Sequence, residues 1–533
     1  MGFSRFYGTS KHVNIIPGDG SLSDDDISFN SDDDFEPNSI RQPHKSRTVI
    51  SESESDFSDV ENVPLLNSQT ASTSKAKGKS AKKDWFIWKK GKMPASDSDN
   101  FKFKGNSELP EAIMQLDTSA EVFQFLFTSD MIDFIAEQSN LKSIQENIDK
   151  PVGIRKEEIE QFIGIVIFMS CVKLPAARMY WTKHVGQPQV YDVMTCNRFE
   201  AIKRFLHFNN NENFIPRDKD GHDKLFKIRR ILDMIRKRLM LVPKEEFLSV
   251  DEQIIPTKCR HELKQYNPAK PNKWGYKNHV LSGVSGFSYD FEIFAGKQSN
   301  SHPSDAPDLG VSSNVVTRLT STVPRHRNFK ICFDNWFNSP RLQVYLYKNG
   351  LLPLGTVRLN CVLNSNMPTE KELKKRGRGS MEEKIAVIDN VKLSLVSWFD
   401  NKNVSLLSAY VGSEPTTTKR RYVRHEKKYK DISCPQAVDV YNQHMGGVDL
   451  LVSVCSVTTE FIYDLVSVSE HLRKVGRAHI PNKRGRRPSI LGAPTSSRGD
   501  TPMSLPNSPI PTKKPRKTPV RHQDIPLDST IME

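Results

Sequence analysis

Charge is distributed so unevenly along this 533-residue sequence that only its middle can fold around an apolar core. Residues 18–62 contain 13 acidic and 3 basic residues, whereas residues 471–533 contain 13 basic and 4 acidic residues together with ten prolines. Such stretches bury too little apolar surface to offset the conformational entropy lost on folding. We therefore predict a disordered arm over 1–105, acidic and then basic, and a disordered basic tail over 481–533.

The basic tail contains two clusters typical of nuclear-import signals. The clusters are Lys483, Arg484, Arg486 and Arg487, followed by Lys513, Lys514, Arg516 and Lys517. The same residues could instead lie along DNA phosphates or enter a minor groove, and a solvated tail without a partner is the simplest alternative. We predict that the protein is nuclear.

Several classes of protein are disfavoured by the sequence. No run of about 18 apolar residues is present, so we expect no membrane-spanning helix. The first residues do not lead into an apolar segment of a secretory signal. The seven cysteines are scattered without a C-x-x-C pair, which argues against zinc knuckles and disulfide frameworks and fits a reducing compartment. We expect no zinc.

Residues 106–246 show the apolar spacing of helices and are predicted to form a helical domain. The segment Leu225–Leu239 has an apolar stripe, with basic residues on its other faces. Such a helix could follow DNA, or it could expose a solvated face of a core helix. The candidates for DNA contact are Arg178, Arg198, Lys203, Arg204, Lys273 and Lys277.

The pattern changes to short strands over 247–358. A strand over 247–250 is predicted to end at Asp251, and a strand over 329–333 is predicted to end at Asp334. Between them, 274–284 and 289–295 form a predicted hairpin. Ser339 then caps a helix that begins at Pro340 and stops at Gly350, before a strand over 351–357. This order predicts an α/β unit with a mixed sheet.

Residues 359–431 interrupt the α/β unit. We predict a strand pair, 387–399 and 404–410, turned by residues 400–403, with a basic run on either side. A helix that opens at Pro435 then leads to Asp449.

Three aspartates could meet at one edge of this sheet. If the first two strands are neighbours, Asp251 and Asp334 emerge together, and Asp449 could fold back over them. Such oxygen ligands suit Mg²⁺ or Mn²⁺, and two ions could cut a phosphodiester. The residues alone leave capping and turn formation as an alternative, and a glycosidase pair is formally possible.

Several long motifs resemble the piggyBac transposase family over about residues 108–452. They are Ser249–Gln253, Gln265–Lys277, Phe333–Ser339 and Tyr441–Asp449, with Arg178–Trp181 and Arg198–Phe208 upstream. The resemblance implies a ribonuclease-H-like core over 247–358 and 432–456, an inserted β-rich domain over 359–431, and a helical dimerisation and DNA-binding domain that 106–246 builds with 457–480.

The family's chemistry follows from the same resemblance. It implies that Asp251, Asp334 and Asp449 bind two Mg²⁺ or Mn²⁺ ions and catalyse DNA strand cleavage and transfer. It also implies double-stranded DNA partners, namely terminal repeats and TTAA sites, and a homodimer.

The sequence departs from the family pattern at its C-terminal side. Val452 replaces a further acid three residues after Asp449, and no cysteine follows Cys455, so the family's zinc-binding domain is not expected. We therefore predict a domesticated or degenerate transposase whose catalytic activity is in question. The alternative is a non-catalytic nuclear DNA-binding or chromatin protein, or a protein scaffold, derived from a transposase.

Overall fold

The computed structural model of the chain describes residues 87–94, 99–268, 270, 273–296, 306–423, 427–457 and 459–476. The predicted acidic arm up to residue 86 and the basic tail from residue 477, with both candidate nuclear-import clusters, lie outside these residues. None of the helices in the described ranges is long and apolar enough to cross a membrane.

The last part of the predicted N-terminal arm is folded. Strand β1 (Lys89–Lys90) pairs antiparallel with β8 (Met381–Ile388). The side chains of Trp88, Met93 and Phe101 are buried. The prediction of disorder up to residue 105 is thus wrong for residues 87–94 and 99–105, because apolar side chains spaced along a polar stretch are buried. Trp88 joins the apolar cluster around Ala386 and Leu393, and Phe101 joins the cluster around Leu354 and Tyr410.

The segment before residue 240 is helical, as its apolar spacing predicts. Its α-helices are α2 (Glu111–Met114), α3 (Ser119–Leu126), α4 (Ser129–Glu146), α5 (Lys156–Cys171), α6 (Pro188–Tyr191), α7 (Cys196–Phe205) and α8 (Phe226–Leu239). Thr118 and Glu121 form a capping box at the start of α3. One apolar cluster joins α4, α5 and α7 through Ile132, Ile159, Ile165, Phe199 and Ile202.

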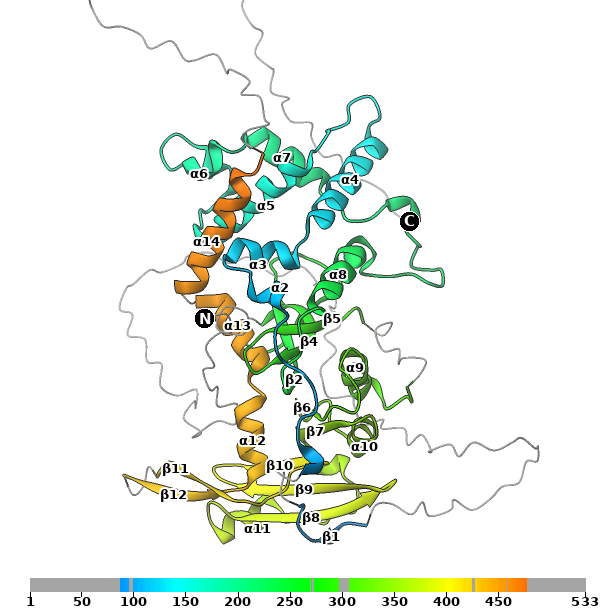
Figure 1. Cartoon of the computed structure of the whole chain (residues 1–533), viewed down its shortest axis with the longest axis vertical. Coiled ribbons are helices and arrows are strands. Elements are labelled where there is room, and N and C mark those ends of the chain that lie inside the picture. Colours follow the sequence, from blue (N-terminus) through cyan, green and yellow to red (C-terminus); the bar gives the residue numbers. More distant parts are fainter. Residues whose placement is uncertain are drawn as a thin grey trace, which may run out of the picture. The chain divides into compact units, whose positions relative to one another are not determined.

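A helix from far along the chain completes this helical layer. Helix α14 (Thr459–Lys474) lies beside α5 (Figure 1). The Ser469 hydroxyl donates to the Gly164 carbonyl at 2.7 Å, and a Cβ atom at Gly164 would lie 3.0 Å from the Ser469 carbonyl oxygen. Glycine at this position therefore lets the two helices approach closely.

A mixed sheet forms the centre of the described chain. Its core strands are β2 (Phe247–Pro256), β3 (Lys264–Tyr266), β4 (Trp274–Gly283), β5 (Ser288–Ile293), β6 (Phe329–Phe333) and β7 (Leu351–Thr356). β2, β6 and β7 are parallel neighbours, while β4 runs antiparallel to β2, β3 and β5. The strand order is β1-β8-β9-β10-β7-β6-β2-β4-β3, with β5 also paired to β4.

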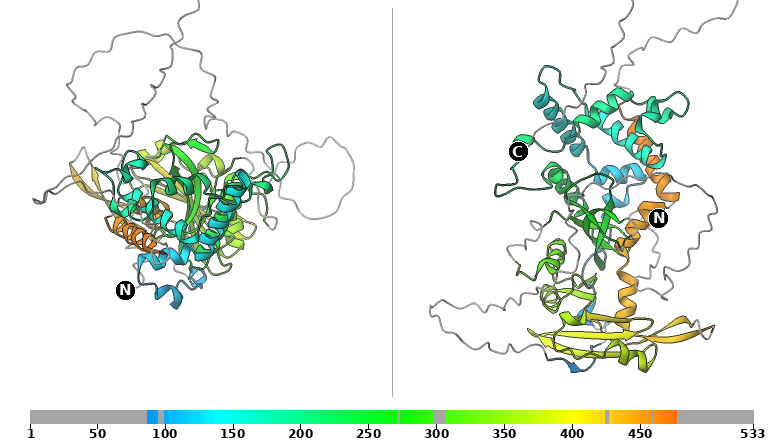
Figure 2. Two further views of the ribbon diagram at one scale, coloured as in Figure 1. Left: turned by 90° about the horizontal axis from the view of Figure 1, so that it is seen from above. Right: turned by 180° about the vertical axis from the view of Figure 1, so that it is seen from behind.

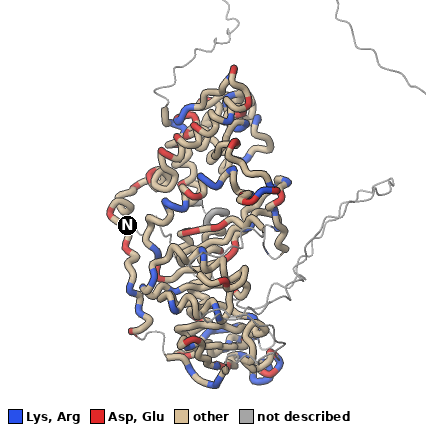
Figure 3. The backbone as a smooth tube through the Cα atoms, turned by 90° about the vertical axis from the view of Figure 1, so that its right-hand side faces the viewer, with Lys and Arg blue, Asp and Glu red and all other residues tan. Residues whose placement is uncertain are grey.

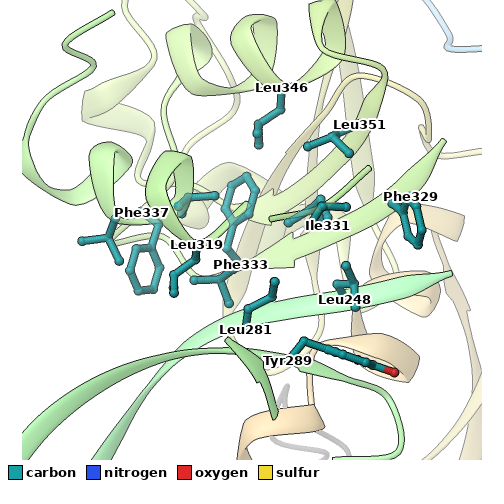
Figure 4. Packing of buried hydrophobic residues seen from close by; sticks show 14 of the residues in the cluster. Leu248, Leu281, Tyr289, Leu319, Phe329, Ile331, Phe333, Phe337, Leu346 and Leu351 are labelled. Atoms are coloured by element: carbon teal, nitrogen blue, oxygen red, sulfur yellow. The ribbon is translucent and has the colours of Figure 1, made fainter. Parts of the chain in front are cut away.

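Helices cover both faces of this sheet. Helices α9 (Val311–Thr320) and α10 (Pro340–Lys348) pack on one face, where Leu248, Leu281, Ile331 and Phe333 are buried (Figure 4). Helix α12 (Gln436–His444) packs on the other face, against Cys332 and Leu354. The alternation of Ile331, Cys332 and Phe333 between two cores explains why this short strand is apolar throughout.

The predicted insertion is partly a continuation of the core sheet. Strands β8, β9 (Val391–Phe399) and β10 (Asn403–Ser408) join it through the antiparallel pair of β10 with β7. The helix α11 (Glu370–Arg376) precedes them, and β11 (Thr417–Val423) and β12 (Lys428–Cys434) form a separate two-stranded sheet.

The strand predicted over 387–399 starts too early: residues 391–399 form β9, which pairs antiparallel with β10 as predicted, whereas residues 387–388 belong to β8. Asp389 and Asn390 have positive φ angles of 49° and 65° and turn the chain between β8 and β9. These two residue types tolerate the left-handed conformation that a two-residue hairpin turn needs.

Candidate active site

Asp251 and Asp334 occupy adjacent positions on two parallel strands. The register of β2 and β6 pairs Val250 with Phe333, and the two aspartates follow immediately. Adjacent strands lie about 4.8 Å apart, so the two backbones bring both carboxylates to one place. β6 ends before Asp334, whereas β2 continues to Pro256 because β4 still pairs with it. The prediction that the first strand ends at Asp251 is therefore wrong, but β2 and β6 are neighbours, and this is the condition on which the expected meeting of the two carboxylates depends.

Asp449 lies in the first turn of α13 (Gly447–Val457), which begins against the same strands. A Cβ atom at Gly447 would lie 2.5 Å from the Ser282 Oγ and 2.9 Å from the Ser249 Oγ, and closer still to the Gly283 carbonyl oxygen. Ser249 precedes Asp251 by two residues on β2, so both side chains lie on the sheet face that α13 covers. Only glycine allows the helix to start this close to the strands. In the right-hand view of Figure 2, α13 is part of the orange segment that lies beside the green strands of the central sheet.

The pKa of Asp251 is shifted by its surroundings. Burial raises the pKa of Asp251 to about 7, and the charges of Asp449 and Asp334 raise it as well. The charge of Lys270 and the backbone N–H of Glu252 act in the opposite direction. Asp251 and Asp334 are half-buried and Asp449 is exposed, so the group opens to solvent on the side of α13.

Asp334 is held by a residue that the sequence analysis did not identify. The Thr356 hydroxyl, at the end of β7, donates to Asp334 Oδ1 at 2.7 Å. The hydroxyl of Tyr441 on α12 is buried nearby, where burial, with a smaller contribution from the charge of Asp334, raises its pKa well above its usual value. A signal for Thr356 was available, because a polar residue at the end of a strand parallel to β6 must emerge beside Asp334.

The donor set suits a hard divalent cation. All three side chains offer carboxylate oxygens, and a bound cation would favour the charged form of Asp251, whose pKa is raised mainly by burial and to a smaller extent by the other two carboxylates. In the described ranges, however, no three His, Cys, Asp or Glu side chains are already arranged to hold an ion. Binding would therefore require side-chain reorientation, for which the exposed Asp449 has room.

Val452 lies one helical turn after Asp449. Its side chain is 38% exposed, so α13 presents an apolar group to solvent at the position where the resemblance implies a further acid.

Two of the candidate DNA contacts are committed to contacts within the protein. Arg198 forms two hydrogen bonds with Glu158, both at 2.7 Å, and also donates to the carbonyls of Val152 and Gly153. Lys277 pairs with Glu252 at 2.8 Å. These contacts give both residues a structural role, and their contact with DNA stays a prediction.

The other four candidates are exposed. Arg178, in the short helix η2 (Ala177–Trp181), pairs with Glu200, and Arg204 lies 3.8 Å from Glu146. Lys203 and Lys273 are exposed. Basic and acidic residues are interspersed along the described chain (Figure 3).

The sequence family described as Transposase IS4 matches residues 118–462 of the chain. The human piggyBac transposable element-derived protein 3 is 30% identical over 339 residues, which are 62% of this chain and 55% of that protein. The human piggyBac transposable element-derived protein 2 is 28% identical over 333 residues, which are 61% and 54% of the two chains. The chain thus spans about half the length of the curated relatives that it matches.

A similar fold occurs in a solved structure of a piggyBac transposase synaptic complex with hairpin DNA, determined by electron cryo-microscopy. The TM-score is 0.52 at 22% identity, and the match covers 68% of this chain and 75% of the other.

Proposed function

Because the chain belongs to the piggyBac-type transposase family, we propose that Asp251, Asp334 and Asp449 form a divalent-metal site that cuts and transfers DNA strands. The observation that carries this proposal is the register of β2 and β6, which sets two aspartates side by side. The close approach of Gly447 to β2 and β4 supports the placement of the third aspartate, Asp449.

The strand order supports a ribonuclease-H-like core. Three antiparallel strands, β5, β4 and β2, are followed by β6 and β7, both parallel to β2. The carboxylates of Asp251 and Asp334, at adjoining positions of β2 and β6, fit that arrangement.

The chain's own residues would hold and orient the metal site. The three aspartates would be the ligands, with Asp334 oriented by Thr356. Bound Mg²⁺ or Mn²⁺ would supply an activated water and charge stabilisation for the leaving oxygen. Lys270, whose charge already acts on Asp251, would attract the DNA phosphate toward the carboxylates. We further propose that the protein acts in the nucleus as a homodimer, on duplex terminal repeats and TTAA sites.

The test is a cleavage assay with Mg²⁺ or Mn²⁺ and duplex DNA that carries the element's flanking repeats and TTAA ends. Asp251→Asn, Asp334→Asn and Asp449→Asn should each abolish cleavage while preserving DNA binding. Asp389→Asn is a matched control, because Asp389 is a surface acid paired with Lys348. Cleavage that survives any one of the three substitutions would exclude this site.

A second function is favoured by Val452, which places an apolar group where an acid would complete the family pattern. In that case the protein binds DNA without cutting it. The same assay would then show no cleavage, while binding would weaken steeply with salt because phosphate contacts dominate. Salt-independent binding to a protein, with none to duplex DNA, would instead indicate a scaffold.

A further inference from the structure

An exposed pair of aromatic residues lies at the base of the loop that joins β3 to β4. Tyr266 and Trp274 are cross-strand partners, with ring centroids 4.7 Å apart. Their side chains are 52% and 53% exposed, although aromatic side chains of this size usually bury most of their surface. The Lys264 ammonium lies over the Trp274 ring, 5.3 Å from its centroid, and Lys273 is exposed next to Trp274.

The loop between these residues reaches back to the carboxylates. The Asn267 side chain donates to Glu252 Oε1 at 2.8 Å, and its backbone N–H donates to the Lys273 carbonyl at 2.7 Å. Glu252 follows Asp251 on β2, so Asn267 contacts the strand that carries the first aspartate. The aromatic pair therefore lies next to a residue that is bonded to this strand.

We infer that Tyr266 and Trp274 form a stacking platform for an unpaired nucleobase of the DNA strand that enters this site. Exposed aromatic faces bind the flat face of a base, and nearby lysines bind the phosphates that connect bases. A base inside a duplex hides its faces against its neighbours, so the platform selects single-stranded or unpaired nucleotides. This inference rests on the proposed function, because it takes DNA as the ligand of the carboxylate site.

The experiment compares two DNA ligands in EDTA, so that binding is measured without cleavage. One is a blunt duplex, and the other is the same duplex with a short single-stranded overhang. The wild type should prefer the overhang, and Trp274→Ala should lower affinity for the overhang by about 5- to 150-fold, the range that stacking of one base supplies, while barely changing affinity for the blunt duplex. Trp274→Phe should retain most of the preference, because the aromatic face remains.

A matched control is available on another ribbon. Tyr429 on β12 also has an exposed aromatic cross-strand partner, Tyr422, and a cation over its ring, Arg420. Tyr429→Ala should leave the preference for the overhang unchanged. Equal losses for both ligands in Trp274→Ala, or no loss, would overturn the inference, as would a change in oligomeric mass, which would make the pair a protein interface.

The outcomes also separate this inference from the proposed function. A wild type that binds neither DNA would refute the proposed function and the platform with it. A preference for the overhang that is equally strong in the wild type and in Trp274→Ala would refute only the platform. Asp334→Asn should keep the preference, since the platform acts before any chemistry.

Discussion

The contact of Gly447 with the central strands gives a sharp test of how Asp449 is positioned. Gly447→Ala would place a Cβ atom 2.5 Å from the Ser282 Oγ and 2.9 Å from the Ser249 Oγ, and closer to the Gly283 carbonyl. A serine side chain can shift, but the Gly283 carbonyl belongs to the backbone of β4 and is held in the sheet. The start of α13 must therefore move away, and Asp449, two residues on, must move with it.

The expected cost is that of overpacking a close contact, about 1–3 kcal/mol in the free energy of unfolding. This lowers the ratio of folded to unfolded protein about 5- to 150-fold. Ser282→Ala should not rescue the loss, because it removes the movable neighbour and leaves the backbone contact. Ser282→Ala alone loses the 3.0 Å contact between Ser249 and Ser282, and this separate effect must be subtracted. After that subtraction, the double variant Gly447→Ala/Ser282→Ala should retain most of the loss in the free energy of unfolding that Gly447→Ala causes.

Urea denaturation measures this cost, and calorimetric titration with Mn²⁺ reports on Asp449. Gly447→Ala should weaken Mn²⁺ binding even in buffers where it is fully folded. Val452→Ala is the control on the same helix, because its side chain is exposed, and it should change neither quantity. Unchanged stability and Mn²⁺ affinity in Gly447→Ala would refute the reasoning, as would full rescue by Ser282→Ala.

Three further predictions concern titration and ion pairs. The pKa of Asp251 is raised from 3.8 to about 7, so the folded state loses stability as the pH rises across that interval. In EDTA, the stability of Asp251→Asn relative to that of the wild type should therefore grow from about pH 4 to about pH 8, as measured by urea denaturation. Arg198→Ala leaves the largely buried Glu158 with only its contacts to Arg155 and should cost about 2–4 kcal/mol in thermal unfolding. Lys203→Ala should stay within about 0.5 kcal/mol, and equal effects would contradict the structural role of Arg198. Arg236→Met removes the guanidinium that pairs at 2.6 Å with the Asp290 carboxylate, which is only 1% exposed. It should lower the free energy of unfolding by about 3–5 kcal/mol, again measured by thermal unfolding, and a loss below about 1 kcal/mol would show that the pair is solvated.

The sequence predicted those elements whose signals are local. Ser339, Pro340 and Gly350 mark a helix with its own cap, first residue and stop, and the structure confirms α10 at Pro340–Lys348. The strand over 329–333 is confirmed to the residue, because both of its faces are buried.

The wrong predictions of strand ends and sheet pairing concern strands whose extent or neighbour depends on residues far away in the sequence. β2 continues beyond Asp251 because β4 pairs with it, and a pairing partner cannot be seen in the strand's own residues. The joining of β10 to β7 likewise depends on which sheet edge is open, so the predicted insertion could not be recognised as part of the core sheet. Thr356 is a different case, because its role follows from the parallel pairing of β6 with β7, which the predicted order of strand, helix and strand already indicated.

The return of α14 to α5 has a consequence for synthesis of the chain. Gly164 and Ser469 are 305 residues apart. At the usual 5–20 residues per second, about 15–60 s separate the emergence of the two helices from the ribosome. During that interval the face of α5 around Gly164 is without its covering helix, while strands β2 to β10 of the central sheet are translated. The helical layer is thus begun before these strands are made and is completed only after them.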